Sequence, residues 1–234
     1  MNQILVNEKV YVTPKLVRKK RFYKIQFTVC IIIVAVLISC YVYSVYDQRK
    51  HESYSQTILS DFDNTVIDDT LVVALNQRAE EVPTENQMQI MDQFNTVYKA
   101  PSGKEYKVDS ILNIPSLGIN YPILSETTNE LLKISLTKFW GGEPNAVGNY
   151  CVVGHNYDGK DIFFGKLHKI NNGDIVELKD KTGKTMKYKV YNKFIVKPND
   201  VACTSQLTNG RKELTLITCS EGGKTRLIVK CRAE

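Results

Sequence analysis

An uncharged apolar stretch near the N-terminus constrains this chain more than any other feature. Residues 25–46 carry no charged side chain and include a run of Ile, Val and Leu at 31–38. A helix rises about 1.5 Å per residue, so this stretch is long enough to cross the roughly 30 Å hydrocarbon core of a bilayer. We therefore expect a membrane-spanning helix at 25–46, with interfacial aromatic residues near its ends.

Basic side chains precede this stretch and set its expected orientation. Much of the net charge of +6 lies in one cluster, which consists of Lys15, Arg18, Lys19, Lys20, Arg21 and Lys24. Basic residues flanking a membrane helix favour the cytoplasmic side. We expect residues 1–24 to form a cytoplasmic tail and everything after residue 46 to be extracellular, in a single-pass cell-membrane protein. A nucleic-acid-binding arm is the alternative, but a membrane explains the adjoining apolar run better.

A lipid anchor is the main alternative to an uncleaved helix. The tetrapeptide at 37–40, Leu-Ile-Ser-Cys, resembles a lipobox ending at Cys40. Against lipidation, the apolar run continues past Cys40 and the basic tail is long. Either anchor leaves the C-terminal domain on the same side of the membrane.

Residues 47–104 are expected to form a polar, partly helical linker. Helical patterns occur at 47–59 and 85–98, and the second aligns Met88, Met91, Phe94 and Tyr98 near one face. Those apolar side chains are expected to pack on the following domain rather than bind a ligand. Pro83, Pro101 and Gly103 interrupt the region.

From residue 105 the pattern is that of a β domain, which we place at 105–234. Helical intervals are expected only at 129–136 and after Phe163. Turn sequences such as Asn209-Gly210 separate short runs of β-branched and apolar residues. Many short strands in one domain favour a closed or nearly closed barrel, so the fold class is mainly β. The expected strands are 108–114, 119–123, 149–154, 175–178, 184–196, 213–219 and 226–231.

The strongest chemical signal is a cysteine at the end of one strand. The run 214–219 ends at Cys219, a turn follows at 220–224, and Arg226 opens the next strand. A cysteine is most often a small buried hydrophobe, but a nucleophilic thiol needs a neighbouring base or cation. His155, which directly follows the strand at 149–154, supplies the base, and Arg226 supplies the cation. The alternative for His155 is a structural histidine bonded by Asn156.

Other sites are excluded by spacing. The six cysteines include no C-x-x-C pair and do not cluster with the histidines, so we assign no metal and no cofactor. The Gly-Lys-Thr sequences at 183–185 and 223–225 lack the earlier glycine of a phosphate-binding loop. A papain-like protease would place its cysteine before its histidine, whereas here Cys219 follows His155.

These residues resemble the signatures of sortases, the cysteine transpeptidases of Gram-positive cell surfaces. The sequence T-L-I-T-C at 215–219 with Arg226 resembles their T-L-x-T-C…R signature, and 148–155 resembles their G-N…G-H strand. Residues 112–119, 164–167 and 173–174 are similar to other parts of the same domain. The resemblance covers about residues 105–234 and implies an eight-stranded sortase-like β-barrel with a few short helices.

The resemblance also implies a mechanism. Cys219 would attack the Thr–Gly carbonyl of an L-P-x-T-G-like sorting signal on a surface protein and form a thioacyl enzyme. His155 would act as acid and then base, and Arg226 would stabilise the oxyanion. A peptidoglycan precursor amine would then accept the acyl group. In this reading Thr218, Val201, Ala202 and Leu207 are candidate substrate contacts, although the last three could equally be simple loop packing.

The subclass stays open between several forms. A pilin-polymerising sortase usually carries a lid with an Asp-Pro-aromatic motif, and no Asp-Pro dipeptide occurs here. Haem-protein-anchoring sortases carry a helical insertion, for which the interval between His155 and Cys219 leaves little room. We therefore favour a compact, single-anchor sortase. The non-enzymatic alternative is a membrane-tethered β-barrel module that binds peptides without catalysis.

Overall fold

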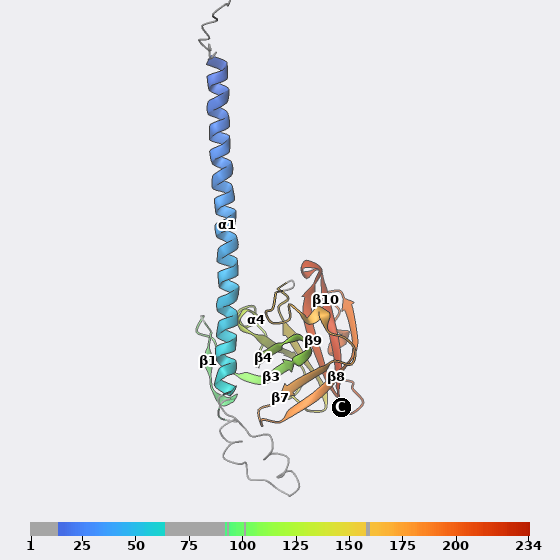
Figure 1. Ribbon diagram of the computed structural model, residues 1–234. Helices are drawn as coiled ribbons and strands as arrows, with labels where there is room; N and C mark the ends of the chain where they lie inside the picture. Colours follow the sequence, from blue (N-terminus) through green and yellow to red (C-terminus); the bar gives the residue numbers. More distant parts are fainter. Residues whose placement is uncertain (1–13, 64–91, 93, 101, 158–159) are drawn as a thin grey trace, which may run out of the picture. The chain divides into compact units, whose positions relative to one another are not determined.

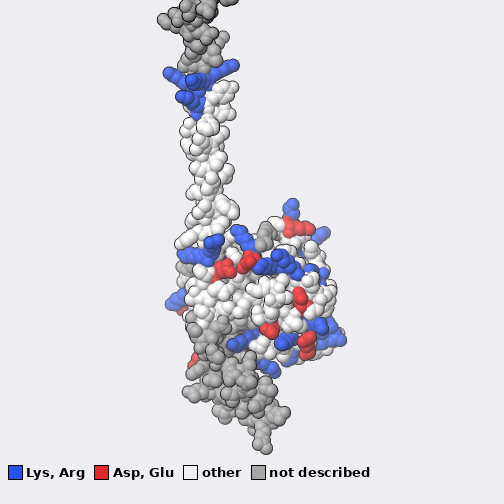
Figure 2. Space-filling view, viewed as in Figure 1, with Lys and Arg blue, Asp and Glu red and all other residues white. Residues whose placement is uncertain are grey.

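The structure, a computed structural model, describes residues 14–63, 92, 94–100, 102–157 and 160–234. The chain divides into two compact units, Met1–Gln48 and Arg49–Glu234. The helix α1 (Pro14–Asp63) begins in the first unit and ends in the second. Its uncharged part is long and apolar enough to cross a membrane. Figure 2 shows Lys and Arg side chains gathered at the N-terminal end of α1, followed by a stretch without charges.

The predicted helices at 25–46 and 47–59 are therefore parts of one longer helix. The second unit starts at Arg49, and the linker at 47–104 stays a prediction. Within that unit, Ile58 and Leu59 at the end of α1 are buried together with Phe94 against the β domain. Ser55 donates a buried hydrogen bond of 2.9 Å to Ser135. These contacts fix the last turns of α1 to the domain that follows.

The second unit is built on a closed barrel of eight strands in the order β10-β8-β7-β3-β4-β5-β6-β9 (Figure 1). The fold class predicted from the sequence is confirmed. Most neighbouring strands are antiparallel, but β4 with β5 and β6 with β9 are parallel. The strands are β3 (Val108–Ile114), β4 (Ile119–Leu124), β5 (Leu136–Trp140), β6 (Gly148–Gly154), β7 (Ile175–Lys179), β8 (Thr185–Val196), β9 (Lys212–Ser220) and β10 (Thr225–Ala233).

Short elements connect these strands. A two-stranded sheet of β1 and β2 precedes the barrel. Single turns of helix lie between strands, so the expectation of few and short helices holds for the described part of the β domain. The elements are β1 (Tyr98–Lys99), β2 (Glu105–Tyr106), η1 (Pro115–Leu117), α4 (Leu131–Ile134), η2 (Leu167–Lys169), η3 (Ala202–Thr204) and η4 (Glu221–Gly223).

Alternation along the strands separates two apolar cores. In β9, Leu214 and Leu216 face the barrel interior, while Ile217 faces the other way. The strands β6 and β10 alternate in the same manner. The cluster on the outward side, which we call the outer apolar cluster, consists of Cys151, Val153, Phe194, Val196, Cys203, Ile217 and Ile228.

The sequence prediction of a helix at 129–136 is too long at both ends. Only Leu131–Ile134 form a helix, and Ser135 is extended with φ −161° and ψ −168°. The Ser135 hydroxyl donates to the carbonyl of Pro122 at 2.6 Å, which turns the chain into strand β5. β5 pairs with β4 and β6 over only a few residues, and its outer end is exposed. Its side chains therefore lack the alternating pattern by which strands are recognised.

Two other expected helices also differ from the structure or lie partly outside its described residues. The interval after Phe163 forms only the short η2. Most of the helix expected at 85–98 lies outside the described residues, including Met88 and Met91, and its last residue, Tyr98, belongs to β1. The seven strands expected from the sequence all form, with ends within two residues of those observed.

Candidate active site

Cys219 and Arg226 are direct partners across the β9–β10 hairpin. They form the next-to-last pair of this antiparallel ladder, beyond which only Ser220 and Thr225 pair. Directly opposed residues project from the same face of a sheet, so the thiol and the guanidinium share one side. The turn between them needs glycine, because Gly222 and Gly223 adopt φ of 62° and 91°. The sequence placed both residues correctly at a strand end.

His155 is brought to the same rim by the parallel pairing of β6 and β9. Gly154 pairs with Thr218, so the next residues along the two strands are His155 and Cys219. The hydroxyl of Thr218 donates to the Gly154 carbonyl at 2.8 Å. One residue further, the Asn156 amide donates to the Cys219 carbonyl at 2.9 Å. Hydrogen bonds on both sides of His155 therefore tie the end of β6 to the end of β9.

The packing around Gly154 explains why the position before His155 is a glycine. It faces the barrel interior, where an added Cβ would lie 2.4 Å from Leu136 and 2.8 Å from Phe164. Contacts of that length are not tolerated in a packed core. The absence of a side chain lets the end of β6, directly before His155, pack closely against Leu136 and Phe164.

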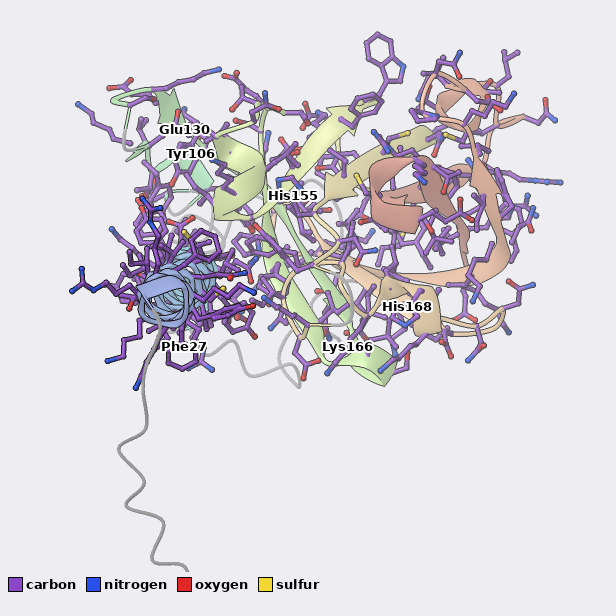
Figure 3. All side chains as sticks on the ribbon, turned by 90° about the horizontal axis from the view of Figure 1, so that it is seen from above. Phe27, Tyr106, Glu130, His155, Lys166 and His168 are labelled. Carbon is purple, nitrogen blue, oxygen red and sulfur yellow. The ribbon has the colours of Figure 1, made fainter. Side chains whose placement is uncertain are left out.

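The surroundings of His155 favour its neutral form. The ring is half-buried and lies 5.6 Å from the Tyr157 ring, measured between centroids. Burial lowers the pKa of His155, and the positive charge of Lys133 in α4 lowers it further. Figure 3 shows His168 on a part of the barrel well separated from His155. As expected from the sequence, His168 is exposed; the side chain of His51 lies outside the described residues.

The Arg226 side chain is oriented by the turn that precedes it. Its Nη1 donates to the carbonyls of Gly223 at 2.9 Å and Thr225 at 3.0 Å. A guanidinium has five N–H donors, so these bonds leave further donors for another acceptor. Arg226 is therefore held in place while it retains the capacity to bind an oxyanion or a carbonyl oxygen.

The other thiols of the barrel are in different environments. All six cysteines, which lie within the described residues, are free thiols. Burial raises the pKa of Cys151 to about 12 and raises that of Cys231 well above its ordinary value. Burial also raises the pKa of Cys203. Cys219 is only half-buried. Its exposure distinguishes it from Cys151 and Cys231, because a nucleophilic thiol must be reached by its substrate.

The candidate substrate contacts differ in burial: one is inside the barrel and three are on its surface. Thr218 is 1% exposed, and its hydroxyl is already bonded to Gly154, so it supports the site from inside the barrel. Val201, Ala202 and Leu207 lie on the segment 197–211, which connects β8 to β9 and contributes Cys203 to the outer apolar cluster. All three are exposed, and Leu207 is 91% exposed.

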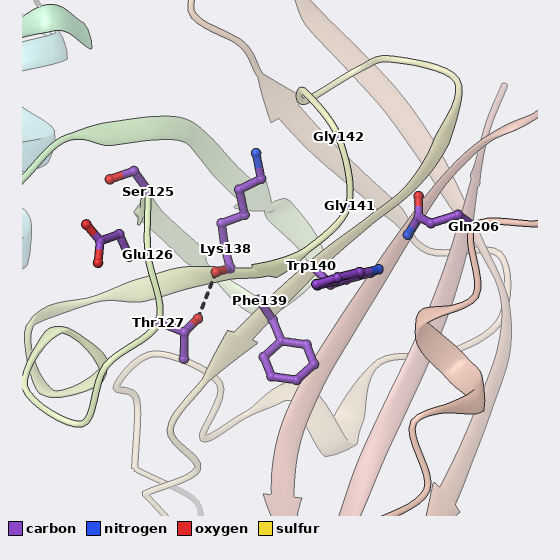
Figure 4. A pocket seen from close by; sticks show the side chains of 9 residues that line it. All are labelled: Ser125, Glu126, Thr127, Lys138, Phe139, Trp140, Gly141, Gly142 and Gln206. Atoms are coloured by element: carbon purple, nitrogen blue, oxygen red, sulfur yellow. Dashed lines mark hydrogen bonds between the residues drawn. The ribbon is translucent and has the colours of Figure 1, made fainter.

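A groove of about 590 Å³ opens beside this segment (Figure 4). Trp140, which pairs with Cys151 across β5 and β6, is 59% exposed along it, next to the exposed Phe139. Gln206 closes the groove from the 197–211 segment. The remaining lining residues are Ser125, Glu126, Thr127, Lys138, Gly141 and Gly142.

The sequence did not identify several of these residues. Lys133, Asn156 and Trp140 reach the site only through the fold, and the only available hint was the position of Asn156 next to His155. Among the described residues, no group of three or more His, Cys, Asp or Glu side chains is arranged to hold a metal ion.

The eight-stranded barrel has a thiol and a guanidinium paired at its rim and a histidine at the end of the next strand. These features define the class of protein as a β-barrel with a cysteine-centred site. Residues 112–234 match the family described as "Sortase domain". This match covers more than half of the 234 residues, so the chain belongs to the sortase family. The resemblance drawn from the sequence is confirmed.

Individual relatives agree. The chain is 39% identical over 85 residues to "Putative sortase YwpE" of Bacillus subtilis, a match that covers 36% of this chain and 80% of that protein. It is 28% identical over 108 residues to "Sortase A" of Bacillus anthracis, covering 46% of this chain. That match spans half of the relative's length, 50%.

A solved structure shares the fold. The X-ray structure of Clostridium perfringens sortase C with the C-terminal cell wall sorting motif aligns with a TM-score of 0.52 at 18% identity. The alignment covers 75% of this chain and 98% of that one. At this identity the likeness concerns the fold alone.

Proposed function

We propose that this protein is a membrane-anchored cysteine transpeptidase that cleaves a sorting signal of the L-P-x-T-G type between Thr and Gly. The observation that carries the proposal is the pairing of Cys219 with Arg226 on the next-to-last rung of the β9–β10 ladder, with His155 just beyond the end of the adjoining strand. Acyl transfer through a thioester requires a nucleophile, a cationic hydrogen-bond donor and an acid–base group.

In the first step the sulfur of Cys219 bonds to the carbonyl carbon of the substrate threonine. The bond from that carbon to the glycine nitrogen breaks, and a protonated His155 gives its proton to the departing amine. In the second step His155 takes a proton from the incoming amine, whose nitrogen bonds to the carbonyl carbon while the carbon–sulfur bond breaks. His155 then returns the proton to the sulfur of Cys219, which restores the thiol. The lowered pKa of His155 favours a neutral imidazole at rest, so the proton delivered in the first step comes from the Cys219 thiol.

Arg226 stabilises the negative charge that develops on the substrate carbonyl oxygen in both steps. Fixed hydrogen-bond donors of this kind contribute about 3 kcal/mol or more to lowering an acyl-transfer barrier. The two bonds from Arg226 to the carbonyls of Gly223 and Thr225 hold the guanidinium in advance, so little rotational freedom is lost when the substrate binds.

The outer apolar cluster and the segment 197–211 supply a surface for the apolar part of the signal. Val201, Ala202 and Leu207 expose small and apolar side chains there, in keeping with a Leu-Pro sequence. A similar fold, that of the Clostridium perfringens sortase C, is known with a cell wall sorting motif. We propose that this chain takes its sorting signal on the corresponding face.

The location and the acceptor complete the proposal. The apolar part of α1 anchors the protein in the cell membrane, with the basic end in the cytoplasm and the barrel outside. The substrates are then surface proteins with C-terminal sorting signals, and the acceptor is an amine of a peptidoglycan precursor. No nucleic acid takes part.

The test is a transpeptidation assay with the full chain in detergent micelles. An L-P-x-T-G peptide is incubated with triglycine or with a lysine-containing peptide, and products are identified by mass spectrometry. We expect the amine-linked product and a thioacyl adduct on Cys219. Cys219→Ala abolishes both, whereas Cys203→Ala retains the adduct; His155→Ala slows turnover severely, whereas the exposed His168→Ala does not.

Each other outcome has a defined meaning. Product with the lysine peptide but not with triglycine would indicate a pilin-polymerising enzyme. Peptide binding without an adduct would indicate a tethered binding module. A Cys219→Ala protein that still joins peptide to amine would end the proposal.

A further inference from the structure

A buried lysine lies on the outward side of β10, away from the proposed chemistry. Lys230 is 9% exposed, although lysine is almost never buried without partners. Its Nζ lies 2.8 Å from the Thr215 hydroxyl, 3.3 Å from the Cys203 carbonyl and 3.3 Å from the Glu213 carboxylate. An ammonium has three N–H donors, and here each has an oxygen partner.

The bond from Lys230 fixes the direction of the next one. An ammonium can only donate, so the Thr215 oxygen accepts from Lys230 and its own proton is free to be given elsewhere. That proton goes to the side-chain oxygen of Asn149, at 2.6 Å. The Asn149 amide group is thereby oriented, with its oxygen toward Thr215 and its nitrogen pointing away.

Asn149 passes this orientation to the segment 197–211. It is 1% exposed, and its side-chain nitrogen donates to the carbonyls of Cys203 at 2.9 Å and Ser205 at 3.1 Å. Its backbone is bonded too: the Gln206 side chain accepts from the Asn149 N–H at 3.0 Å and donates to the Asn149 carbonyl at 2.8 Å. The side chain and the peptide groups of Asn149 therefore hold three residues of the segment, Cys203, Ser205 and Gln206.

The far end of this chain of hydrogen bonds is the wall of the groove. Gln206 lines the groove on the side of Trp140 (Figure 4), and Leu207 is the next residue in the sequence. The amide of Gln206 uses its remaining N–H on the Thr204 carbonyl, at 3.0 Å. Both N–H groups and the oxygen of this amide are thus engaged with backbone, which makes Gln206 a fixed wall rather than a mobile side chain.

We propose that Lys230 is a positioning residue that, through Thr215 and Asn149, sets the position of the segment 197–211 and so the affinity for the sorting peptide. The proposal rests on the proposed function for the identity of the bound peptide. Lys230 belongs to the middle of β10, four residues beyond Arg226, and acts on binding rather than on the reacting atoms.

The physical reason for a lysine here is specificity of arrangement. Burying an ammonium costs free energy that is recovered only when its partners are in place. Segment 197–211 therefore favours the conformation in which the Cys203 carbonyl accepts from Lys230. Conformations in which the Lys230 Nζ lacks one acceptor are disfavoured. A hydrophobic side chain of the same length at position 230 would pack equally well against several conformations of the segment.

The experiment compares Lys230→Met and Thr215→Val with wild type, as full chains in detergent. Each variant removes one link while keeping the side-chain volume. We expect KM for the sorting peptide to rise about tenfold, the effect of losing one hydrogen bond to a charged group, with kcat nearly unchanged. Lys189→Met is the matched control, because Lys189 is an exposed lysine whose carboxylate partner, Glu234, is 3.8 Å away.

A second readout does not depend on catalysis. Hydrogen exchange at the Asn149 amide, which is bonded to the Gln206 side chain, and over 203–208 accelerates in both variants but not in Lys189→Met. This readout applies even when wild type shows no transpeptidation, so failure of the proposed function and failure of this inference are distinguishable. Removing Lys230 also leaves Glu213 with one cation, Arg232, at 3.2 Å.

The double variant Glu213→Gln with Lys230→Met therefore serves when the single variant folds poorly. Unchanged exchange and unchanged KM in a folded variant would overturn the inference. A fall in kcat at constant KM would do so as well, because it would place Lys230 in the chemistry rather than in the positioning of the segment.

Discussion

The Asn156 amide donates to the backbone carbonyl of Cys219 across 2.9 Å, although the residues are 63 positions apart in the chain. This bond joins the residue after His155 to the proposed nucleophile itself. Together with the bond from Thr218 to Gly154, it makes the spacing of His155 and Cys219 a property of two strands rather than of a loop. Sites built on strands hold their geometry more closely than sites built on loops.

Replacing Asn156 should therefore affect rate more than folding. In Asn156→Ala we expect kcat to fall about tenfold or more, because a small misplacement of an acid–base group is costly. The midpoint of thermal unfolding should change by only a few degrees. Asn172→Ala, in an exposed turn, is the control and should leave both quantities unchanged. A variant that keeps full kcat would show that the bond does not position His155.

Gly154→Ala tests the packing beneath His155. The new methyl group would overlap Leu136 and Phe164, so we expect a loss of about 1–3 kcal/mol in the free energy of unfolding. kcat should fall as well, because β6 must shift to relieve the contacts with Leu136 and Phe164 and would displace His155 with it. Thermal unfolding and steady-state kinetics measure the two effects. Gly142→Ala, where an added Cβ meets nothing within 4 Å, should unfold at the wild-type temperature.

The sequence predicted the parts of the fold that follow local rules. The strands around the site have alternating or continuous β-branched residues and glycine-containing turns, and both signals are local. The pairing of Cys219 with Arg226 could be expected for the same reason, since one short hairpin contains both. The meeting of His155 with Cys219 depends on the parallel pairing of β6 and β9, for which the resemblance to sortases was the only guide.

The parts that could not be predicted depend on distant contacts. Strand β5 forms because β4 and β6 flank it, and its exposed end, with Phe139 and Trp140, has no alternating pattern. Lys133 affects His155 only because α4 lies beside the end of β6. Lys230 looks like a surface residue in the sequence, and its burial follows from the path of the segment 197–211.

The thiols of the barrel should react in an order set by exposure and pKa. With iodoacetamide at pH 8, we expect Cys219 to be labelled first and Cys203 next. Cys151 and Cys231 should resist, since burial excludes the reagent and raises the pKa of both. Peptide mapping by mass spectrometry measures each site. Labelling of Cys151 before Cys219 would contradict the assignment of Cys219 as the accessible thiol.

Arg226→Lys keeps the charge but removes the planar arrangement of donors. Lysine cannot bind the carbonyls of Gly223 and Thr225 and still present a fixed donor to the substrate. We expect kcat to fall by about 10²–10³, the effect of losing an oxyanion donor, and Arg226→Ala to fall at least as far. Arg211→Lys, on the exposed segment before β9, is the control. Full activity in Arg226→Lys would show that charge alone suffices.

The lowered pKa of His155 makes stability depend on pH in a defined direction. Between the folded-state pKa and the ordinary value of 6.5, the unfolded chain binds a proton that the folded protein does not, so folding stability rises with pH across this window. The contribution is fully present above 6.5 and is lost as the pH falls through the folded-state pKa. In His155→Gln, the part of the slope due to this residue should disappear in urea titrations at a series of pH values.

Lys133→Met tests the second cause of the shift. Removing the positive charge should raise the pKa of His155 partway toward its ordinary value, while burial continues to depress it. Titration of the imidazole proton signals by NMR measures this directly, since the chain has only three histidines. Lys169→Met, beside His168, should leave the His155 titration unchanged. A His155 signal that does not move in Lys133→Met would assign the whole shift to burial.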